Sequence, residues 1–419
     1  MAATKTDHVL VLGGGIGGLC AAALLAARGL RVTVLERQPH VGGKLRQVEA
    51  GGRMVDAGPT VFTLAGVLEE IFAACGANMW DEVRLTPADV LARHAWPDGS
   101  RLDLFADPAR TVEAIGDLAG ANEARAYQAF AAEAARIYAT LAEAFMWQPR
   151  TNPVGLTFRL GLRRLPELQA TRPYETMWKA LRGHFRDPRL VQLFARYATY
   201  CGADPFRAPA TLMLIAHVET AGVWLVDGGL SRLADALARV ATRHGATIRT
   251  DAEVAEILVE SGAAAGVRLA SGDVVRGDAV IANCDPSAIG AGRMGAAAQR
   301  AVGTVSAGAR SLSSLTFMGL GEAEGFALQH HNVFFSGDYA REFADIRAGH
   351  LPRAPSVYLC AQDRGPDGCF DGGPERVQII VNAPATGDGP ALTQGELEEC
   401  ETAMWTCLRH SGLSFRFVP

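Results

Sequence analysis

The chain has 419 residues, 49% hydrophobic and 20% charged, so it is long enough for two or three domains and too apolar to be disordered. Its formal net charge of −5, with basic residues spread along the chain, excludes a strongly basic surface, and no nucleic acid partner is expected. The eight cysteines form no CxxC pair and no His/Cys cluster at metal spacing. No metal site or disulfide framework is therefore predicted, and a reducing cytoplasm is favoured. With no signal peptide and no apolar run near the roughly 20 residues of a spanning helix, we expect a soluble or peripheral protein.

The first predicted element is a buried strand over residues 8–12 that runs directly into a glycine-rich turn and a helix. Gly13 is expected to make the tight turn, Gly15 to let the backbone approach a pyrophosphate, and Gly18 to let the helix pack closely on the strand. Free N–H groups at the start of the helix, which ends near Gly29, favour phosphate. A turn of this kind without any ligand remains an alternative, because the glycine spacing alone is a weak signal.

The next segment strengthens the dinucleotide prediction. A second strand over residues 31–35 ends at Glu36, which lies 21 residues after the second glycine of the turn, where an acid binds a ribose hydroxyl. Gly42, Gly43 and Lys44 follow six to eight residues later. This second glycine pair with a basic residue resembles the extended signature of flavoproteins that bind FAD, and FAD is therefore favoured over NAD.

Further along, the pattern predicts a discontinuous arrangement. Residues 53–60 contain a Gly-Pro-Thr turn, for which an ordinary turn is the alternative. Helical periodicity runs from about residue 111 to 144, and a further largely helical stretch reaches about residue 218. Near residue 222 the pattern changes. A helix capped by Ser231 is expected to end at Gly245. The short strands predicted after it, which can return to the first sheet and complete it, are 246–250, 254–259, 266–269, 273–276 and 278–282.

Residues 144–166 have the composition of an interfacial stretch. They contain no acidic residue, and arginines alternate with aromatic and leucine side chains, which suits docking on anionic lipid. Prolines and glycines within the stretch argue against one continuous helix. The alternative is an internal loop packed on the nucleotide-binding domain.

Together these motifs resemble the bacterial phytoene-desaturase-type carotenoid dehydrogenases. The resemblance rests on the glycine turn, Glu36, Gly42-Gly43-Lys44, the 56–60 turn and the block from residue 222 to 283. The stretches at 211–224 and 330–339 look most like the hydroxyneurosporene (methoxyneurosporene) dehydrogenase branch, the 1-hydroxycarotenoid 3,4-desaturases.

The resemblance implies an α/β fold with a discontinuous, two-dinucleotide-binding, Rossmann-like FAD domain. A mixed α+β substrate domain and a helical, membrane-facing insert would accompany it. The implied divisions are residues 1–75 and 222–290 for the FAD-binding domain, 76–221 for the helical and membrane-facing region, and 291–419 for the substrate domain. The glycine- and proline-rich segment with which such proteins end has no match here. We therefore expect part of the fold to be missing, with weak FAD retention if residues 1–419 are the whole protein.

The resemblance also implies roles for particular residues. The glycine turn would face the pyrophosphate, Glu36 the adenosine ribose, and Val254 the adenine through its backbone. Segments 43–44 and 58–60 would bind the remaining part of the dinucleotide and the flavin. The implied cofactor-binding residues are Gly13, Gly15, Gly18, Glu36, Arg37, Gly43, Lys44, Gly58, Pro59, Thr60 and Val254. Arg163 is the one catalytic candidate, although Leu160 stands where some relatives have an acid.

The implied activity is FAD-dependent desaturation of a carotenoid. Because no side chain accepts a hydride, a flavin must take it, and the protein aligns the substrate in a dry channel. Candidate channel residues are Trp147, Trp224, Phe334 and Phe335. A quinone or oxygen would reoxidise the flavin, at the inner membrane on its cytoplasmic side.

Three alternatives remain open at this point. A phytoene desaturase would have the same motifs. A flavin amine oxidase would need a late lysine, yet the chain has none after Lys179. A non-catalytic isoprenoid-binding relative would not need the intact flavin motifs. No catalytic base is assigned, because a hydrogen-bonded structural pair explains His217 and Glu219 equally well.

Overall fold

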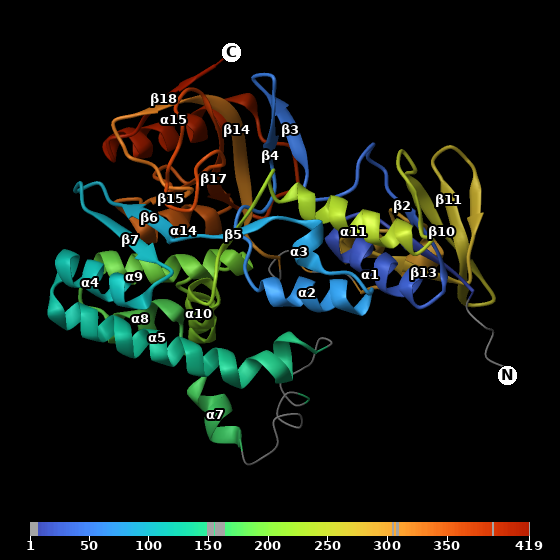
Figure 1. Cartoon of the computed structure of the whole chain (residues 1–419), viewed down its shortest axis with the longest axis horizontal. Coiled ribbons are helices and arrows are strands. Elements are labelled where there is room, and N and C mark those ends of the chain that lie inside the picture. Colours follow the sequence, from blue (N-terminus) through green and yellow to red (C-terminus); the bar gives the residue numbers. More distant parts are fainter. Residues whose placement is uncertain are drawn as a thin grey trace. The chain divides into compact units, whose positions relative to one another are not determined.

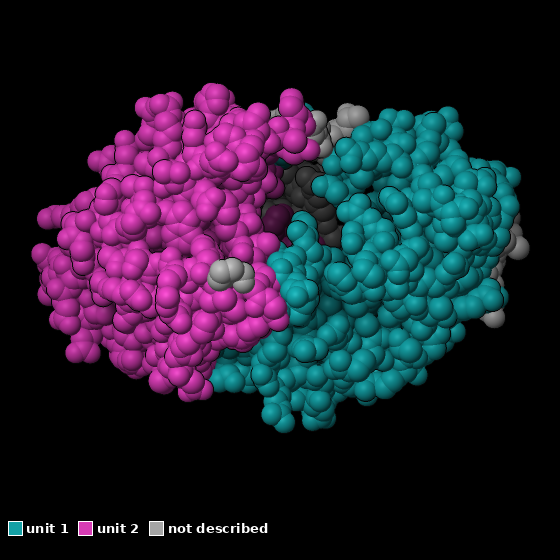
Figure 2. All heavy atoms as spheres, turned by 90° about the horizontal axis from the view of Figure 1, so that it is seen from above, with its two compact units in different colours: residues 1–49, 54–86, 224–310 teal, residues 50–53, 87–223, 311–419 magenta. Residues whose placement is uncertain are grey.

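The structure is a computed structural model that describes residues 7–148, 155, 164–303, 306, 310–387 and 389–418. The chain divides into two compact units. Unit 1 comprises residues 1–49, 54–86 and 224–310, and unit 2 comprises residues 50–53, 87–223 and 311–419 (Figure 2). The sequence predicts divisions after residues 75, 221 and 290, whereas the compact units divide after residues 86, 223 and 310.

The centre of unit 1 is a parallel sheet with strand order β13-β1-β2-β9. Residues Val9 to Leu12 of β1 are buried, as their apolar sequence predicts for a central parallel strand. Helices α1 and α11 pack their alanine and leucine side chains into the same core. The bounds are β1 (His8–Leu12), α1 (Ile16–Ala27), β2 (Arg31–Leu35), α2 (Ala65–Ala74), α3 (Met79–Glu82), α11 (Ser231–Arg243), β9 (Thr247–Arg249) and β13 (Ala279–Ala282).

The strands predicted after residue 245 all form, but only two of them complete the first sheet. β9 and β13 pair in parallel with β2 and β1, which confirms the predicted return. The expectation for the three strands between them is wrong, because they form a separate antiparallel sheet. Tight turns connect these strands, so each one forms its backbone hydrogen bonds with its neighbour in the sequence. These strands are β10 (Val254–Glu260), β11 (Ala263–Leu269) and β12 (Val274–Arg276), followed by α12 (Pro286–Gly290) and α13 (Ala296–Gln299).

Two pairs of short strands join the segments of the chain. β3 (Gln47–Ala50) and β4 (Arg53–Asp56) form a hairpin, and β5 (Leu85–Pro87) pairs with β8 (Trp224–Val226). The backbone N–H of Trp224 also donates to the Phe62 carbonyl oxygen at 2.9 Å. The chain therefore re-enters unit 1 near residue 224 against its own N-terminal segment.

Unit 2 contains a mixed sheet with strand order β18-β14-β17-β16-β15-β6-β7. Its apolar side chains form a core with one face of α15 (Gln394–His410). In Figure 1 this helix is the red one beside β14 and β17. The strands are β6 (Val90–Ala95), β7 (Arg101–Phe105), β14 (Ser313–Glu324), β15 (His331–Phe334), β16 (Val357–Ala361), β17 (Glu375–Ala383) and β18 (Ser414–Phe417).

Most helices of unit 2 lie within the predicted helical region, residues 76–221, which also contains the strands β6 and β7. The helices of unit 2 are α4 (Pro108–Ala119), α5 (Ala121–Leu141), η1 (Ala142–Met146), α7 (Leu165–Ala170), α8 (Met177–His184), α9 (Pro188–Ala195), η3 (Arg196–Cys201), η4 (Ala210–Met213), α10 (Leu214–Thr220), α14 (Tyr339–Arg347) and α15 (Gln394–His410). Helix α15 is followed by strand β18, which pairs antiparallel with β14. Within the described ranges, no helix is long and apolar enough to cross a bilayer.

Candidate functional site

The turn between β1 and α1 is built where only glycine fits. Gly13 has a φ of +98°, and a Cβ on it would lie 3.0 Å from the carbonyl oxygen of Asn283. A Cβ on Gly18 would lie 2.1 Å from the Gly13 carbonyl oxygen, which permits the close packing of helix on strand. Helix α1 starts after Gly15 with no side-chain cap and no acidic residue in its first turn. Its first N–H groups are therefore suited to an anion.

The second glycine pair lies against this turn. The Gly42 N–H donates to the Gly14 carbonyl oxygen at 2.8 Å, and Gly15 and Gly42 form an isolated parallel bridge. A Cβ on Gly43 would lie 3.0 Å from the Cα of Gly15. The two glycine motifs, separate in the sequence, thus form one surface made of backbone.

The 58–60 segment joins the same surface. A Cβ on Gly58 would lie 1.7 Å from the carbonyl oxygen of Lys44, so no other residue type fits there without a shift of the backbone. Lys44 and Pro59 are exposed, and Thr60 is half-buried. Three segments that the sequence places in the cofactor site therefore meet beside the start of α1.

Glu36 lies at the end of β2, buried, with both carboxylate oxygens engaged. Oε2 accepts from the Gly14 N–H at 2.6 Å, and Oε1 accepts from the Gln38 N–H at 2.9 Å. The Glu36 carbonyl oxygen accepts from the Ala252 N–H at 2.8 Å, which brings the start of β10, at Val254, next to it. The proximity of Glu36 and Val254 agrees with a shared adenosine site, while their binding roles stay predictions. Arg37 is exposed beside Glu36.

Asn283 is a site residue that was not predicted from the sequence. Asn283 directly follows β13, and its Nδ2 donates to the Gly13 carbonyl oxygen at 3.4 Å. A Cβ on Gly17 would lie 2.7 Å from the Asn283 Oδ1, and a Cβ on Gly15 would lie 3.2 Å from the Asn283 Nδ2, so this amide packs against the glycine turn. The available signal was its position, because polar residues at the carboxyl ends of neighbouring parallel strands gather at one edge.

Asp56 connects the 56–60 segment to the start of α11. Its Oδ2 accepts from the Leu230 N–H at 2.6 Å, and its Oδ1 accepts from Gln47 Nε2 at 2.9 Å. The prediction that Ser231 caps this helix is wrong: Leu230 is the N-cap and makes no side-chain capping bond. The buried carboxylate of a distant segment takes the place of the local cap because it reaches the same free N–H groups.

These residues fit FAD. The glycine surface leaves no room for side chains, the start of α1 carries no side-chain cap, and Lys44 adds an exposed positive charge. Such a surface suits the pyrophosphate of a dinucleotide, whose oxygens accept hydrogen bonds from main-chain N–H groups.

In unit 2, His217 and Glu219 do not form the hydrogen-bonded pair that was one of the two explanations left open for them. The buried Glu219 carboxylate accepts hydrogen bonds from Tyr197 Oη and, at 2.8 Å, from Tyr200 Oη. The His217 ring instead lies 4.9 Å from the ring of Tyr138. Burial, and then the Glu219 charge, raise the pKa of both tyrosines, so both hydroxyls remain protonated donors.

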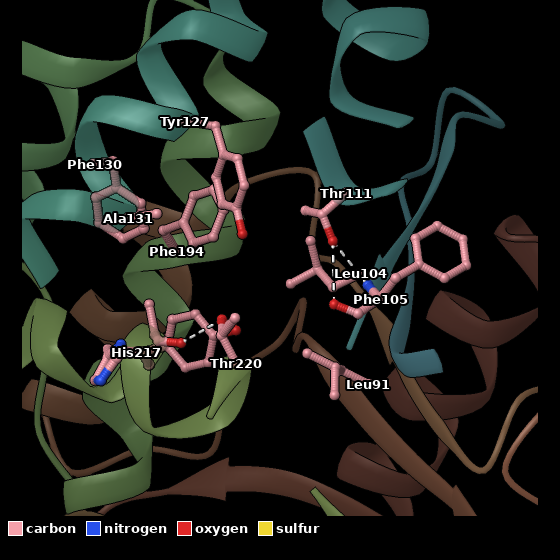
Figure 3. A pocket seen from close by; sticks show the side chains of 12 residues that line it. Leu91, Leu104, Phe105, Thr111, Tyr127, Phe130, Ala131, Phe194, His217 and Thr220 are labelled. Carbon is pink, nitrogen blue, oxygen red and sulfur yellow. Dashed lines mark hydrogen bonds between the residues drawn. The ribbon is translucent and has the colours of Figure 1, made fainter. Parts of the chain in front are cut away.

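His217 lines a small cavity of about 40 Å³ together with Tyr127, Phe130 and Thr220 (Figure 3). Burial lowers the pKa of His217, so its imidazole is neutral near pH 7. In the same view Thr220 Oγ1 turns to the helix backbone, where it donates to the Ala216 carbonyl oxygen at 2.9 Å. The cavity has room for a water molecule and is far too small for a carotenoid.

The predicted channel residues have different environments. Phe334 and Phe335 are fully buried core side chains, and Phe334 packs on Phe326 at a ring distance of 4.9 Å. Trp224 packs edge-on against Trp80, while Trp147 is exposed. Arg163 lies outside the described residues.

The fold and the glycine surface define a class. The family model for the flavin-containing amine oxidoreductases matches residues 16–317, and the chain belongs to that family and, within it, to the carotenoid desaturases. FAD is accordingly its cofactor. The class is an FAD-dependent oxidoreductase.

Individual relatives narrow the assignment. The chain is 45% identical over 417 residues to a hydroxyneurosporene desaturase of Rubrivivax gelatinosus, covering 99% of this chain and 79% of that protein. It is 42% identical to a hydroxyneurosporene desaturase of Cereibacter sphaeroides, covering 98% and 82%. An oxidoreductase from Methanosarcina mazei has a similar structure, with a TM-score of 0.60 at 17% identity, covering 98% of this chain and 88% of that one. The last likeness shows the fold alone.

Proposed function

We propose that this protein is an FAD-dependent desaturase that forms the 3,4 double bond of 1-hydroxy or 1-methoxy carotenoids. The observation that carries the proposal is the 45% identity, over 99% of the chain, to a hydroxyneurosporene desaturase. The glycine surface of unit 1 supports it, because it provides the cofactor site that such an oxidation needs. Phytoene desaturation is the main alternative, since it would use the same cofactor site.

Bound FAD supplies the oxidant, accepting the hydride when a C–C bond of the substrate becomes a double bond. The residues of this chain hold and orient that cofactor. Gly13, Gly15 and Gly18 face the pyrophosphate, Glu36 the ribose and Val254 the adenine.

The remaining predicted residues lie nearer the flavin. Gly43 and Lys44 bind along the dinucleotide, and the Gly58-Pro59-Thr60 turn, whose position Asp56 fixes, lies at the flavin side. Arg163 remains the proposed catalytic residue. The proton released with the hydride goes to a base or water, and a quinone or oxygen reoxidises the flavin.

The protein also docks on the membrane surface in this proposal, because a carotenoid is dissolved in the bilayer. Phe145 and Trp147 are 48% and 46% exposed at the edge of the acid-free 144–166 stretch, and Tyr174 is 99% exposed beyond it. Aromatic side chains beside arginines are typical of an interfacial contact.

The test is a direct comparison of substrates. Purified protein supplied with FAD is incubated anaerobically with liposomes containing 1-hydroxyneurosporene, phytoene or no carotenoid. We expect flavin bleaching, and a product lighter by two hydrogens with a new 3,4 double bond, only with the hydroxylated substrate. Conversion of phytoene alone would assign the alternative. Oxidation of a supplied amine instead would assign an amine oxidase, and bound isoprenoid without bleaching would assign a non-catalytic carrier.

A further inference from the structure

Two histidines and a cysteine meet inside unit 2. His330 and His331 stand at the start of β15, and Cys360 on β16 is the direct cross-strand partner of His331. One side-chain ligand atom from each residue lies within 4.8 Å of the other two. His331 and Cys360 are buried and His330 is half-buried. Within the described part of the chain, these three residues are the group of His, Cys, Asp or Glu side chains that lie close enough together to hold one metal ion.

The hydrogen bonds of the two rings orient them for coordination. His330 Nδ1 lies 2.7 Å from the carbonyl oxygen of Arg364, and His331 Nδ1 lies 2.7 Å from Tyr358 Oη. Each imidazole is thus anchored through Nδ1, which leaves Nε2 as the coordinating nitrogen. Histidine ligands of metal ions usually show this arrangement, in which an oxygen atom accepts from the other ring nitrogen.

A second observation points to a missing partner at this place. His331 Nε2 is fully buried, and no hydrogen-bond partner for it exists among the residues that the structure describes. A buried polar atom without a partner is rare in native proteins and calls for an ion or water. The two rings are nearly perpendicular, with an interplanar angle of 77° and centroids 4.7 Å apart. They therefore do not stack on each other, and ring stacking does not close off this space.

We propose that His330, His331 and Cys360 bind one zinc ion. Imidazole nitrogen and thiolate sulfur are the ligands that zinc prefers, at about 2.0–2.3 Å. Tetrahedral geometry at those bond lengths separates the ligand atoms by about 3.5 Å. Side-chain movements of roughly 1 Å therefore bring the three ligand atoms to coordination distance. Water occupies the fourth position. The ion ties the start of β15 to β16 within unit 2.

The sequence alone predicted no metal site, because thirty positions separate the histidines from Cys360 and no short spacing marks them. Only the pairing of β15 with β16 places His331 opposite Cys360. The proposal is independent of the desaturase assignment, since it concerns an ion bound by residues distant in sequence from every predicted cofactor residue.

Metal analysis of the purified protein tests the proposal. After dialysis against a weak chelator, wild-type protein is expected to keep about one zinc ion per chain. His331→Gln and Cys360→Ser are expected to keep less than about a tenth of that amount. Two controls remove buried groups of the same kind elsewhere in unit 2: His94→Gln, whose Nε2 is also buried and has no hydrogen-bond partner among the described residues, and Cys400→Ser on α15. Both controls are expected to keep the ion.

Cobalt provides a readout that reports the sulfur ligand directly. Wild-type protein from which zinc has been removed, then given Co²⁺, should show a sulfur-to-cobalt charge-transfer band in the difference spectrum against the untreated protein, where flavin absorbance cancels. Cys360→Ser should lack the band, and Cys400→Ser should retain it. Circular dichroism melting identifies any variant that fails to fold, and the wild-type cobalt spectrum is then decisive. Wild-type protein with neither zinc nor a thiolate band, or equal zinc loss in the control variants, would overturn the proposal.

Discussion

Gly58 packs directly on the backbone of Lys44: a Cβ built on Gly58 would stand 1.7 Å from the Lys44 carbonyl oxygen. Since atoms of that kind cannot approach so closely, the contact forces glycine at position 58. It also couples the 56–60 turn to the second glycine pair, so a disturbance of one segment is transmitted to the other.

Gly58→Ala should therefore weaken FAD binding. The added methyl group separates the 44 and 58 segments, and we expect the dissociation constant of FAD to rise at least tenfold, or about 1.4 kcal/mol. Titration of flavin-free protein with FAD, followed by flavin fluorescence, measures it. Gly66→Ala on α2 is the matched control, because a Cβ there meets nothing within 4 Å. Equal affinity in the two variants would show that the segments do not form one cofactor surface.

Tyr200→Phe should destabilise unit 2. The tyrosine hydroxyl donates to the buried Glu219 carboxylate at 2.8 Å, and its loss leaves a buried charge with one donor fewer. We expect the free energy of unfolding to fall by about 1.5–3 kcal/mol in urea titrations. Tyr174→Phe removes the same hydroxyl from a side chain that is 99% exposed and should change nothing. A neutral Tyr200→Phe would mean that Glu219 does not depend on this bond.

Glu342 should make stability depend on pH. It is fully buried, and burial raises its pKa from 4.5 to about 7, against hydrogen bonds from Asn382 and Ser356 that act in the opposite direction. Between those two values the folded protein binds more protons than the unfolded chain. Stability is therefore highest at the acid end of this interval and falls as the pH rises, by about 3 kcal/mol in all.

Glu342→Gln, which resembles the protonated acid, should remove that slope. The measurement is the free energy of unfolding of both proteins from pH 4.5 to pH 8, roughly the interval in which the group titrates. The exposed Glu399→Gln on α15 serves as control and should retain the wild-type slope. Parallel curves for wild type and Glu342→Gln would contradict the prediction.

The aromatic residues at the edge of the 144–166 stretch should contribute to membrane binding. Phe145→Ser with Trp147→Ser removes two half-exposed apolar side chains. We expect binding to anionic liposomes in sedimentation to fall about tenfold or more, since each ring adds apolar contact at the interface. Met54→Ser in unit 1, where the side chain is 48% exposed, is the control. Unchanged sedimentation of the double variant would remove the support for docking through this edge.

Much of unit 1 could be predicted from local sequence. The spacing of Gly13, Gly15 and Gly18 after an apolar strand, with Glu36 at the end of the next strand, predicts β1, α1 and β2 and the turn between them, and these elements form. The 394–410 helix also has a local signal at its start, because Thr393 and Glu396, three residues apart, form a capping box. In each case the determining residues are close neighbours in the chain.

Other features were decided by tertiary structure alone. Asn283 closes the glycine turn from 270 positions away, Asp56 reaches the start of α11 across 174 positions, and Tyr200 rather than His217 binds Glu219. Local spacing determines turns and the face that a helix buries, because those depend on residues within a few positions. Which distant side chains meet depends instead on how strands pair and helices pack. The periodicity of one segment carries no information about which distant segment packs against it.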